Sequence, residues 1–180
     1  SIESDDVTLQ NFRADGSSDE AITSTSISNA HLDNISVSGS RDDGIFINSA
    51  SNSIVSNCNM SGYGVHGCRV GEESIIISCI SDGSNMFNSE GNAFGIYGSR
   101  GIIASSQSIN SEGEGIQLNG DDTICIGNRV TNSGRYGIFS NASVSDHIIA
   151  NNRVSDSGND DIRNNGTGTL LDANLTGASN

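Results

Sequence analysis

The chain has 180 residues, and 76 of them are serine, asparagine or glycine (32, 22 and 22), whereas proline, tryptophan and lysine are absent. Its 22 acidic residues outweigh its 8 arginines, so the net charge is -14, which excludes the basic surface that nucleic-acid binding needs. No segment approaches the roughly 18 consecutive apolar residues of a membrane span. The apolar residues include 22 Ile and 8 Val against 6 Leu, which favours strands because β-branched side chains suit a pleated sheet.

A short motif recurs from one end of the chain to the other. It consists of a small residue, an apolar residue and a variable residue, and its copies lie at 21–23, 44–46, 64–66, 95–97, 115–117, 137–139 and 161–163. Most copies follow a segment with apolar alternation, and these segments lie at 34–37, 54–60, 76–80, 102–109, 124–130 and 148–154. Such segments predict short strands. The chain therefore contains about seven units of roughly 23 residues.

Repeats of this length and composition predict a parallel β-helix. No segment shows a helical period, and six leucines cannot fill the fixed positions of seven leucine-rich repeats. In a parallel β-helix, equivalent strands of successive coils pair at a spacing of about 4.8 Å. Aliphatic residues then line a thin core, and asparagines stack in ladders at the bends.

These units resemble the right-handed parallel β-helix repeats of the pectate-lyase-like superfamily, and the resemblance covers essentially the whole chain. That superfamily includes polysaccharide lyases, some glycosidases, alginate epimerases and bacteriophage tailspikes. The resemblance implies an all-β fold, a right-handed parallel β-helix (solenoid) of about seven coils. The resemblance specifies the fold but leaves several functions open, because one fold hosts several chemistries.

The whole chain, 1–180, is expected to form a single β-helix domain and to be a segment of a longer protein, since no signal peptide is visible at its start. The 31-residue spacing between Gly64 and Gly95 predicts an inserted loop at 82–92. Such a loop is either part of a binding face or a tolerated surface insertion. We interpret 166–180 as a last coil or a tail.

The third residue of each motif copy predicts an outward-facing column, because strand side chains alternate between the two faces of a sheet. The predicted column consists of Thr23, Phe46, His66, Tyr97, Gln117, Phe139 and Arg163. Aromatic faces beside hydrogen-bonding groups suit sugar rings, so the column predicts a polysaccharide-binding face. The alternative is a subunit interface, since tailspike-like β-helices often form trimers and exposed aromatic patches are often buried between chains.

Acidic residues in the turns are candidates for glycoside hydrolysis, which needs two carboxyl groups about 5 Å apart for retention of configuration. Glu90, Glu112 and Glu114 are expected on adjacent coils, where two of them meet this spacing. The alternative is that these acids are solvated turn residues in a strongly acidic chain.

A lyase or an epimerase needs a base near an acidic C–H and a group that neutralises the sugar carboxylate. Tyr63 and His66 are candidates for the base, and Arg69 and Arg100 are candidates for the carboxylate clamp. The segment 63–66 resembles the tyrosine-then-histidine motif of alginate epimerases, but it lacks the Asp-Pro of that motif. His66 is alternatively a surface residue of the predicted column.

No cofactor and no metal site is expected, apart from calcium at the paired aspartates 121–122 and 160–161, although their spacing is not that of a regular calcium site. The four cysteines, Cys58, Cys68, Cys79 and Cys125, lack the spacing of zinc ligands. We interpret them as buried free thiols or, in an extracellular protein, as a source of a disulfide.

The sequence as a whole favours a receptor-binding segment of the phage tailspike or tail-fibre type, outside the cell or on a virion. Its partner is then a polysaccharide or a cell-surface glycan, with no nucleic acid and no membrane, and a homotrimer is one form it can take. The alternatives are an enzyme (a polysaccharide lyase, glycoside hydrolase or uronan epimerase) and a structural trimeric shaft. The net charge of -14 disfavours long-range attraction to anionic glycans, which favours neutral sugars or local arginine clamps.

Overall fold

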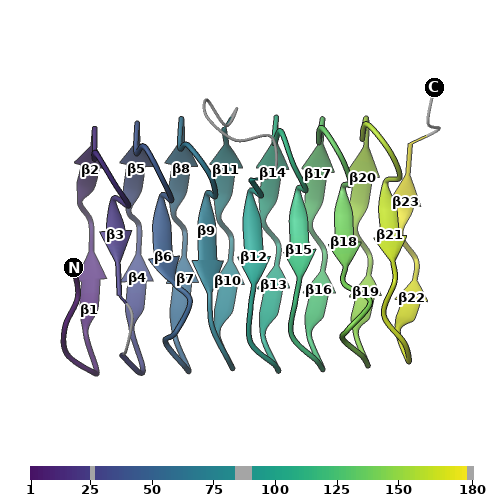
Figure 1. Cartoon of the computed structure of the whole chain (residues 1–180), viewed down its shortest axis with the longest axis horizontal. Coiled ribbons are helices and arrows are strands. Elements are labelled where there is room, and N and C mark those ends of the chain that lie inside the picture. The colour runs from purple at the N-terminus through teal and green to yellow at the C-terminus, as the bar shows by residue number, and fades with distance from the viewer. Residues whose placement is uncertain (25–26, 84–90, 178–180) are drawn as a thin grey trace.

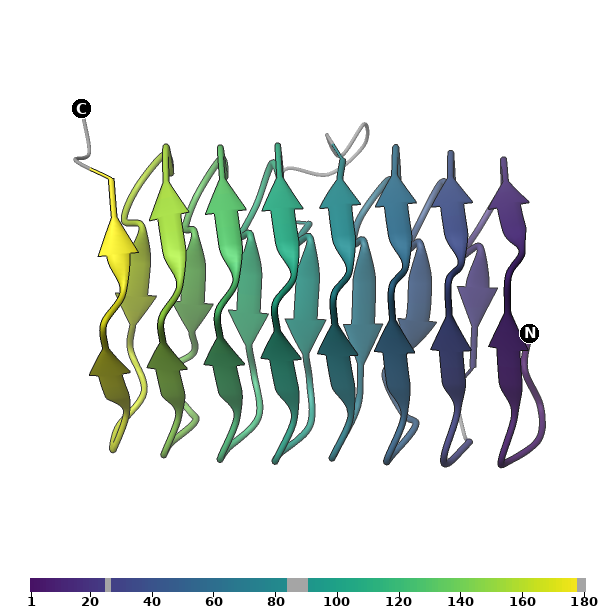
Figure 2. The same cartoon turned by 180° about the vertical axis from the view of Figure 1, so that it is seen from behind.

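In a computed structural model of the chain, residues 1–24, 27–83 and 91–177 are described, and these residues contain strands and no helix. In particular, they hold no helix long and apolar enough to cross a membrane. Three parallel sheets, which we call A, B and C, run the length of the molecule. Figure 1 shows the coils side by side from the N-terminus to the C-terminus with sheet C towards the viewer, and Figure 2 shows sheets A and B from behind.

Each coil contributes one short strand to each sheet in turn. Sheet A contains β1 (Thr8–Gln10), β4 (His31–Asp33), β7 (Ile54–Ser56), β10 (Ile75–Ile77), β13 (Ile102–Ala104), β16 (Ile124–Ile126), β19 (Ile148–Ala150) and β22 (Leu170–Asp172). Sheet B contains β2 (Arg13–Asp15), β5 (Ser36–Ser38), β8 (Asn59–Ser61), β11 (Ile80–Asp82), β14 (Gln107–Ile109), β17 (Arg129–Thr131), β20 (Arg153–Ser155) and β23 (Leu175–Thr176). Sheet C contains β3 (Ile22–Thr23), β6 (Ile45–Ile47), β9 (Cys68–Val70), β12 (Phe94–Ile96), β15 (Ile116–Leu118), β18 (Ile138–Ser140) and β21 (Ile162–Asn164).

The coils wind in a right-handed sense. In Figure 2 the strands of sheets A and B ascend in front, sheet C descends behind, and the chain advances from right to left. Equivalent strands pair in parallel from one coil to the next, as Ile116 of β15 does with Ile138 of β18. The predicted right-handed parallel β-helix of about seven coils is therefore confirmed.

The bend between sheets A and B explains much of the composition. In every coil one residue of this bend has a φ between 48° and 66°, and these residues are Asn11, Asn34, Asn57, Ser78, Ser105, Gly127, Asn151 and Ala173. Asparagine and glycine tolerate this left-handed conformation better than other residues. A chain that makes the same tight bend in every coil therefore needs many such residues.

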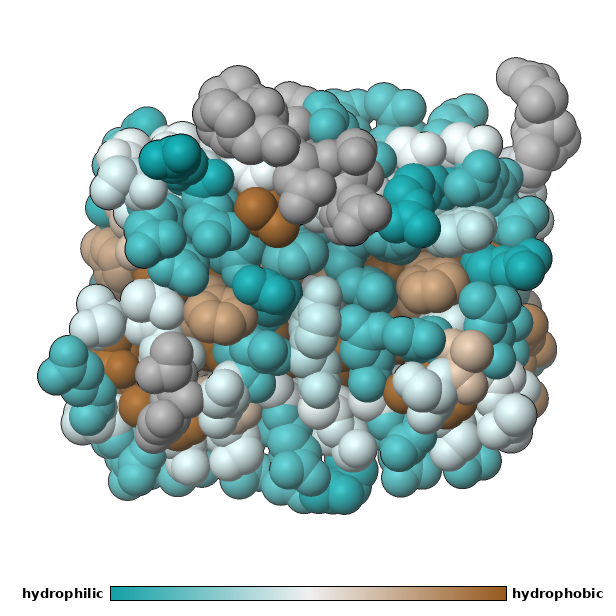
Figure 3. All heavy atoms as spheres, in the orientation of Figure 1, coloured by the Kyte–Doolittle hydropathy of each residue, from teal (hydrophilic) through white to brown (hydrophobic). Residues whose placement is uncertain are grey.

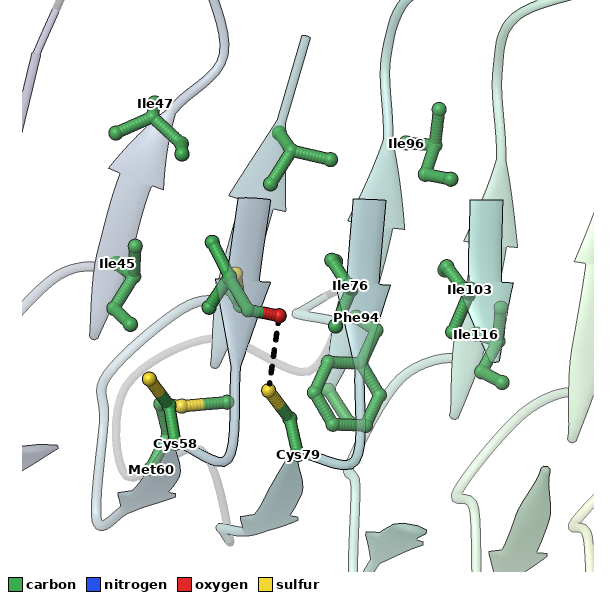
Figure 4. Packing of buried hydrophobic residues seen from close by; sticks show 14 of the residues in the cluster. Ile45, Ile47, Cys58, Met60, Ile76, Cys79, Phe94, Ile96, Ile103 and Ile116 are labelled. Atoms are coloured by element: carbon green, nitrogen blue, oxygen red, sulfur yellow. Dashed lines mark hydrogen bonds between the residues drawn. The ribbon is translucent and has the colours of Figure 1, made fainter. Parts of the chain in front are cut away.

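The core is a thin column of aliphatic and sulfur-containing side chains. Ile45, Ile76, Ile103 and Ile116 are fully buried, and Figure 4 shows them lying along the same interior space as Phe94. Each buried side chain of this size contributes about 1.5–3 kcal/mol relative to exposure. The four cysteines are buried free thiols, as interpreted from the sequence.

An asparagine ladder lines the interior beside the bend between sheets A and B. The Oδ1 of Asn128 accepts the backbone N–H of Ser106 at 2.9 Å, and the Oδ1 of Asn152 accepts that of Asn128 at 2.9 Å. Asn174 does the same for Asn152 at 3.0 Å. Each side chain thus satisfies a buried amide of a neighbouring coil, and the predicted ladder is confirmed.

The extra length at 82–92 is smaller than the repeat spacing predicts. Cys68 pairs with Phe94, 26 positions later, whereas the other sheet C pairs are 22 to 24 positions apart. Asp82 still belongs to β11, and 84–90 lie outside the described residues. At the other end, β22 and β23 pair with β19 and β20, so 170–176 form a further coil.

Candidate functional site

The outer face of sheet C carries several residues that the sequence predicts for ligand binding. In β6, β9, β15 and β18 the first and third residues are buried and the middle residue is partly exposed. The middle residues stack about 4.8 Å apart and form an outer column. This column consists of Thr23, Phe46, Arg69, Gly95, Gln117, Phe139 and Arg163.

His66 and Tyr97 do not belong to the outer column, contrary to the prediction. Cys68 and Phe94 are the first inward residues of their sheet C strands. The motif copy with His66 therefore lies three residues before the position that matches the other coils. The copy with Tyr97 lies two residues after it. At these two inward positions a thiol and a phenyl ring replace the aliphatic side chain of the other coils. Nearby Gly-Val and Gly-Ile pairs have the same sequence pattern as the motif. His66 lies in the turn before β9, and Tyr97 directly follows β12.

Tyr97 nevertheless completes the outer column, because its ring covers Gly95. A Cβ atom added to Gly95 would lie 2.7 Å from Cε2 of Tyr97, so only glycine leaves room for the ring. The guanidinium carbon of Arg69 lies 4.5 Å from the ring centroid of Phe46 and 5.5 Å from that of Tyr97. The Tyr97 hydroxyl donates to Oε1 of Gln117 at 2.9 Å. The aromatic and polar groups of adjacent coils are thereby fixed against one another.

A ladder of buried polar residues precedes the sheet C strands of four successive coils, beside the outer column. The Oδ1 of Asp43 accepts the backbone N–H of His66 at 3.1 Å, and Nδ1 of His66 accepts that of Asn92 at 2.9 Å. The Oδ1 of Asn92 accepts the backbone N–H of Glu114 at 3.3 Å. We call these four residues the polar ladder; each is less than 9% exposed.

Asp43 and Arg69 form the ion pair at one end of the polar ladder. Nη2 and Nε of Arg69 lie 2.6 and 2.7 Å from Oδ2 of Asp43, whose side chain is fully buried. Burial raises the pKa of Asp43 to about 6, against the opposing effect of the Arg69 charge. The carboxylate is therefore ionised above neutral pH and balances the guanidinium.

His66 is a neutral hydrogen-bond donor in this setting. Burial, with a contribution from the Arg69 charge, lowers the pKa of His66 to about 3. Because Nδ1 accepts the N–H of Asn92, the neutral ring carries its proton on Nε2. A ring in this tautomer can donate to a ligand, but it offers no free nitrogen for removing a proton.

The other end of the polar ladder repeats the pattern of an ion pair beside an aromatic surface. Nη1 of Arg135 lies 3.2 Å from Oε1 of Glu114. The guanidinium carbon of Arg135 is 5.8 Å from the ring centroid of Tyr136. The rings of Tyr136 and Phe139 stack with centroids 5.2 Å apart and planes inclined by 15°. These contacts place a flat aromatic surface next to a charge-balanced pair.

A groove of about 340 Å³ lies between the polar ladder and the outer column. Its described lining consists of Val65, His66, Tyr97, Glu114, Gln117, Arg135 and Phe139. Burial raises the pKa of Tyr97, so its phenol stays protonated in this groove. Figure 3 shows the face of sheet C as a hydrophilic surface interrupted by separate apolar side chains. The structure therefore brings together five of the predicted site residues: His66, Tyr97, Glu114, Gln117 and Phe139.

Three predicted catalytic residues lie elsewhere or outside the described part of the chain. Tyr63 is fully buried, and its hydroxyl is 2.7 Å from Oγ of Ser81, so it does not reach the groove. Glu112 lines a different hollow of about 630 Å³ at the bend between sheets B and C. Glu90 lies outside the described residues. The predicted pair of neighbouring catalytic glutamates is therefore not seen among the described residues that line the groove.

Arg100, a predicted clamp for a sugar carboxylate, lies at the bend between sheets C and A. Its Nη2 is 2.6 Å from Oε1 of both Glu72 and Glu73, and all three side chains are exposed. Arg100 therefore makes its ion pairs at a different corner of the coil from the groove.

Asn92 and the pairing of Asp43 with Arg69 have no counterpart in the sequence-based prediction. Asn92 donates from Nδ2 to Oε1 of Gln117, so it links the polar ladder to the outer column. In the sequence, these residues can be recognised by their position, two residues before the first inward residue of a sheet C strand. Once Cys68 is placed inward, that position holds an acid, a histidine, an amide and an acid in four successive coils.

The structure gives little support to a metal site at the predicted aspartate pairs. Asp121 already accepts a backbone N–H at 2.7 Å, and Asp160 lies 3.4 Å from a guanidinium nitrogen. Within the described part of the chain, one other carboxylate group, Asp19, Glu20 and Asp42, has oxygens within 4.8 Å of one another at the surface. Calcium binding stays a prediction.

No protein-family model matches the chain, and no curated protein matches it. Solved structures do share its architecture. The periplasmic alginate epimerase AlgG is 12% identical with a TM-score of 0.66, and the match covers 96% of this chain and 45% of that chain. The A-module of the mannuronan C-5 epimerase AlgE4 from Azotobacter vinelandii is 10% identical with a TM-score of 0.58, covering 98% and 65%.

The surface protein and adhesin PfbA of Streptococcus pneumoniae is similar as well, at 10% identity and a TM-score of 0.56, covering 83% of this chain and 65% of that one. The chain thus spans about half the length of AlgG and about two thirds of the other two. At such identities the likeness concerns the fold. The parallel register, the coil length and the structural neighbours show that the chain has a right-handed parallel β-helix fold.

Proposed function

We propose that the groove on sheet C binds a polysaccharide chain. The observation that carries this proposal is the alignment of aromatic rings and hydrogen-bonding groups along successive coils. Phe46, Tyr97 and Phe139 are interleaved with Arg69 and Gln117. Phe46 and Phe139 are four coils apart, a distance of about 19 Å. A surface of this length suits an extended ligand with a repeating structure.

The chemistry of the groove matches that of a sugar ring. A pyranose presents C–H groups on its faces and hydroxyls at its edge, and aromatic faces attract the former through their negative quadrupole. Phe139 is held by Tyr136, and Tyr97 is held by Gln117. Because these side chains are already fixed, little conformational entropy is lost when a ligand binds.

The structural neighbours support the same class of ligand and a location outside the cytoplasm. AlgG and AlgE4 are epimerases of alginate and mannuronan, and AlgG is periplasmic whereas PfbA is a surface protein. We further propose, from the outward aromatic column and the β-helix fold, that the chain is an extracellular or virion-borne receptor-binding segment of tailspike type.

A glycan array followed by affinity electrophoresis tests the proposal. We expect retardation of the wild type by at least one polysaccharide and a loss of affinity of at least about tenfold in Phe139→Ala and Tyr97→Ala, since aromatic anchors dominate such surfaces. Phe12→Ala is the matched control, because Phe12 is exposed and lies outside sheet C. Absence of binding across the array, or equal effects of all three substitutions, contradicts the proposal.

A second candidate is a lyase or epimerase that acts on a uronan. It is favoured by a groove that holds both the protonated Tyr97 phenol and the guanidinium of Arg135, and by the epimerases among the structural neighbours. A lyase creates unsaturated uronate ends that absorb ultraviolet light, and an epimerase changes the sugar composition seen by proton NMR. Activity that Tyr97→Phe abolishes supports this candidate, and absence of both products overturns it.

The outer column is alternatively a subunit interface in a homotrimer. Phe46 and Phe139 then pack between chains and leave the groove closed to an extended ligand. Light scattering coupled to size exclusion separates the two assignments. A wild-type trimer that dissociates in Phe139→Ala assigns the outer column to the subunit interface. A monomeric wild type leaves the outer column accessible to a ligand.

A further inference from the structure

The arginine in the groove, Arg135, and the arginine beside it, Arg69, are each paired with a carboxylate. Arg69 is paired with Asp43 at 2.6 Å, and Arg135 is paired with Glu114 at 3.2 Å. In each pair the acid is the more deeply buried partner, with 0% and 4% side-chain exposure against 22% and 44% for the arginines. A carboxylate this close weakens the attraction of its arginine for an incoming anion.

The field around the groove is also unfavourable to an anionic ligand. The chain has a net charge of -14, and at low ionic strength such a charge acts over about 30 Å. A polyuronate carries one carboxylate on each sugar, so it meets this repulsion along its whole length. An uncharged glycan does not.

The groups that face the groove suit hydroxyls. His66 carries its proton on Nε2 because its Nδ1 is an acceptor. Gln117 uses its Oε1 as an acceptor for Tyr97 and Asn92, so it presents its amide nitrogen as a donor. These neutral donors, together with the ring of Phe139, bind hydroxyls and C–H faces without a requirement for ligand charge.

We infer that the sheet C groove takes an uncharged, hydroxyl-rich glycan rather than a polyuronate, because the guanidinium groups of Arg135 in the groove and Arg69 beside it are balanced by the buried carboxylates of Glu114 and Asp43. This inference rests on the proposed polysaccharide binding and specifies the ligand class. The inferred ligand differs in charge class from alginate and mannuronan, the ligands named for the epimerases that share the fold.

The test uses matched pairs of polymers in affinity electrophoresis above pH 7. Polygalacturonate and alginate are each compared with their carboxyl-reduced forms, which keep the backbone and lose the charge, alongside the neutral polysaccharides that are retained in the glycan array. We expect the wild type to bind neutral polymers at least about tenfold more tightly than charged ones. We also expect residual binding to polyuronates to strengthen as salt screens the repulsion.

A charge-release variant provides a second readout. Glu114→Gln keeps the size of the side chain and leaves Arg135 without its carboxylate, so we expect an approximately tenfold gain in affinity for polygalacturonate. Glu72→Gln is the matched control, because it changes the net charge by the same amount but removes a partner of Arg100 at a different corner. A gain in Glu114→Gln alone supports the local charge balance, and equal gains in both variants contradict it.

The outcomes separate the inference from the proposed function. Retention of neutral polymers with weak binding of charged ones supports both. Equal or tighter binding of the polyuronates by the wild type overturns the inference and leaves the polysaccharide-binding function intact. Failure of every neutral and charged glycan on the array to bind overturns the proposed function and, with it, the inference.

Discussion

Replacing Asp43 by asparagine changes how stability depends on pH. Burial raises the pKa of Asp43 from 3.8 to about 6, so between these values the folded protein holds a proton that the unfolded chain has released. The stability from this proton is present at low pH and is lost as the pH rises through 6. His66 has the opposite sign, because burial lowers its pKa from 6.5 to about 3. Its contribution is present above pH 6.5 and is lost as the pH falls.

The two contributions largely compensate each other in the wild type. From pH 7 to pH 5, the titration of Asp43 adds about 1.3 kcal/mol to the free energy of unfolding, and that of His66 removes about 2 kcal/mol. Asp43→Asn therefore loses about 1.3 kcal/mol more than the wild type over this range. His66→Asn keeps an acceptor at its ladder position, as Asn92 does in the next coil. It lacks the loss of about 2 kcal/mol that the titration of His66 causes, so its free energy of unfolding rises between pH 7 and pH 5.

Urea denaturation followed by circular dichroism at the two pH values measures these differences. Asp160→Asn is the control for the loss of one carboxylate, because Asp160 occupies the equivalent position of the last sheet C coil and is exposed. Identical pH dependence in the wild type, Asp43→Asn and His66→Asn refutes the burial and the contacts assigned to the polar ladder.

Three further predictions concern the coil. Ile103→Ala lowers the free energy of unfolding by about 2–5 kcal/mol and Ile102→Ala by less than about 1 kcal/mol, because Ile103 is buried and its neighbour points outward; comparable losses in calorimetry contradict the register. Asn128→Ala costs about 1–3 kcal/mol in urea denaturation because it leaves the backbone N–H of Ser106 unsatisfied, and a neutral result contradicts the internal ladder. The four buried thiols stay unreactive towards an aromatic disulfide reagent in native buffer and all react in denaturant; rapid native labelling refutes their burial.

The fold was predictable because each coil repeats the same physical requirements. Isoleucine at inward positions and asparagine or glycine at most bends between sheets A and B recur often enough to reveal the period. Asn128 and Asn152 lie in two nearly identical segments, and the structure pairs these segments coil to coil. A solenoid makes such prediction direct, since each repeat contacts chiefly its neighbours.

The alignment of the middle coils was less predictable. Cys68 and Phe94 occupy inward positions that other coils fill with isoleucine, and a period-two pattern gives no warning when the apolar residue changes type. A shift of even one residue reverses which face a side chain occupies. The sequence pattern therefore predicts His66 on the outer column, whereas the structure has it in the polar ladder.

The candidate site was predictable in its location and not in its chemistry. Gly95 leaves a gap in the outer column, and the ring of Tyr97 folds back over it, a contact that strand alternation does not encode. Likewise, the hydrogen bond to Nδ1 of His66 decides whether the ring donates or accepts. Such properties depend on side-chain packing between coils, which the spacing of motifs leaves undetermined.

The most direct test of glycan binding on sheet C is backbone amide NMR during titration with a glycan that the array retains. We expect chemical-shift changes to concentrate in β9, β12, β15 and β18 and in the turns that precede these strands. Changes that concentrate on the outer faces of sheets A and B, or a spectrum unaltered by saturating glycan, contradict the assignment of the groove as the binding site.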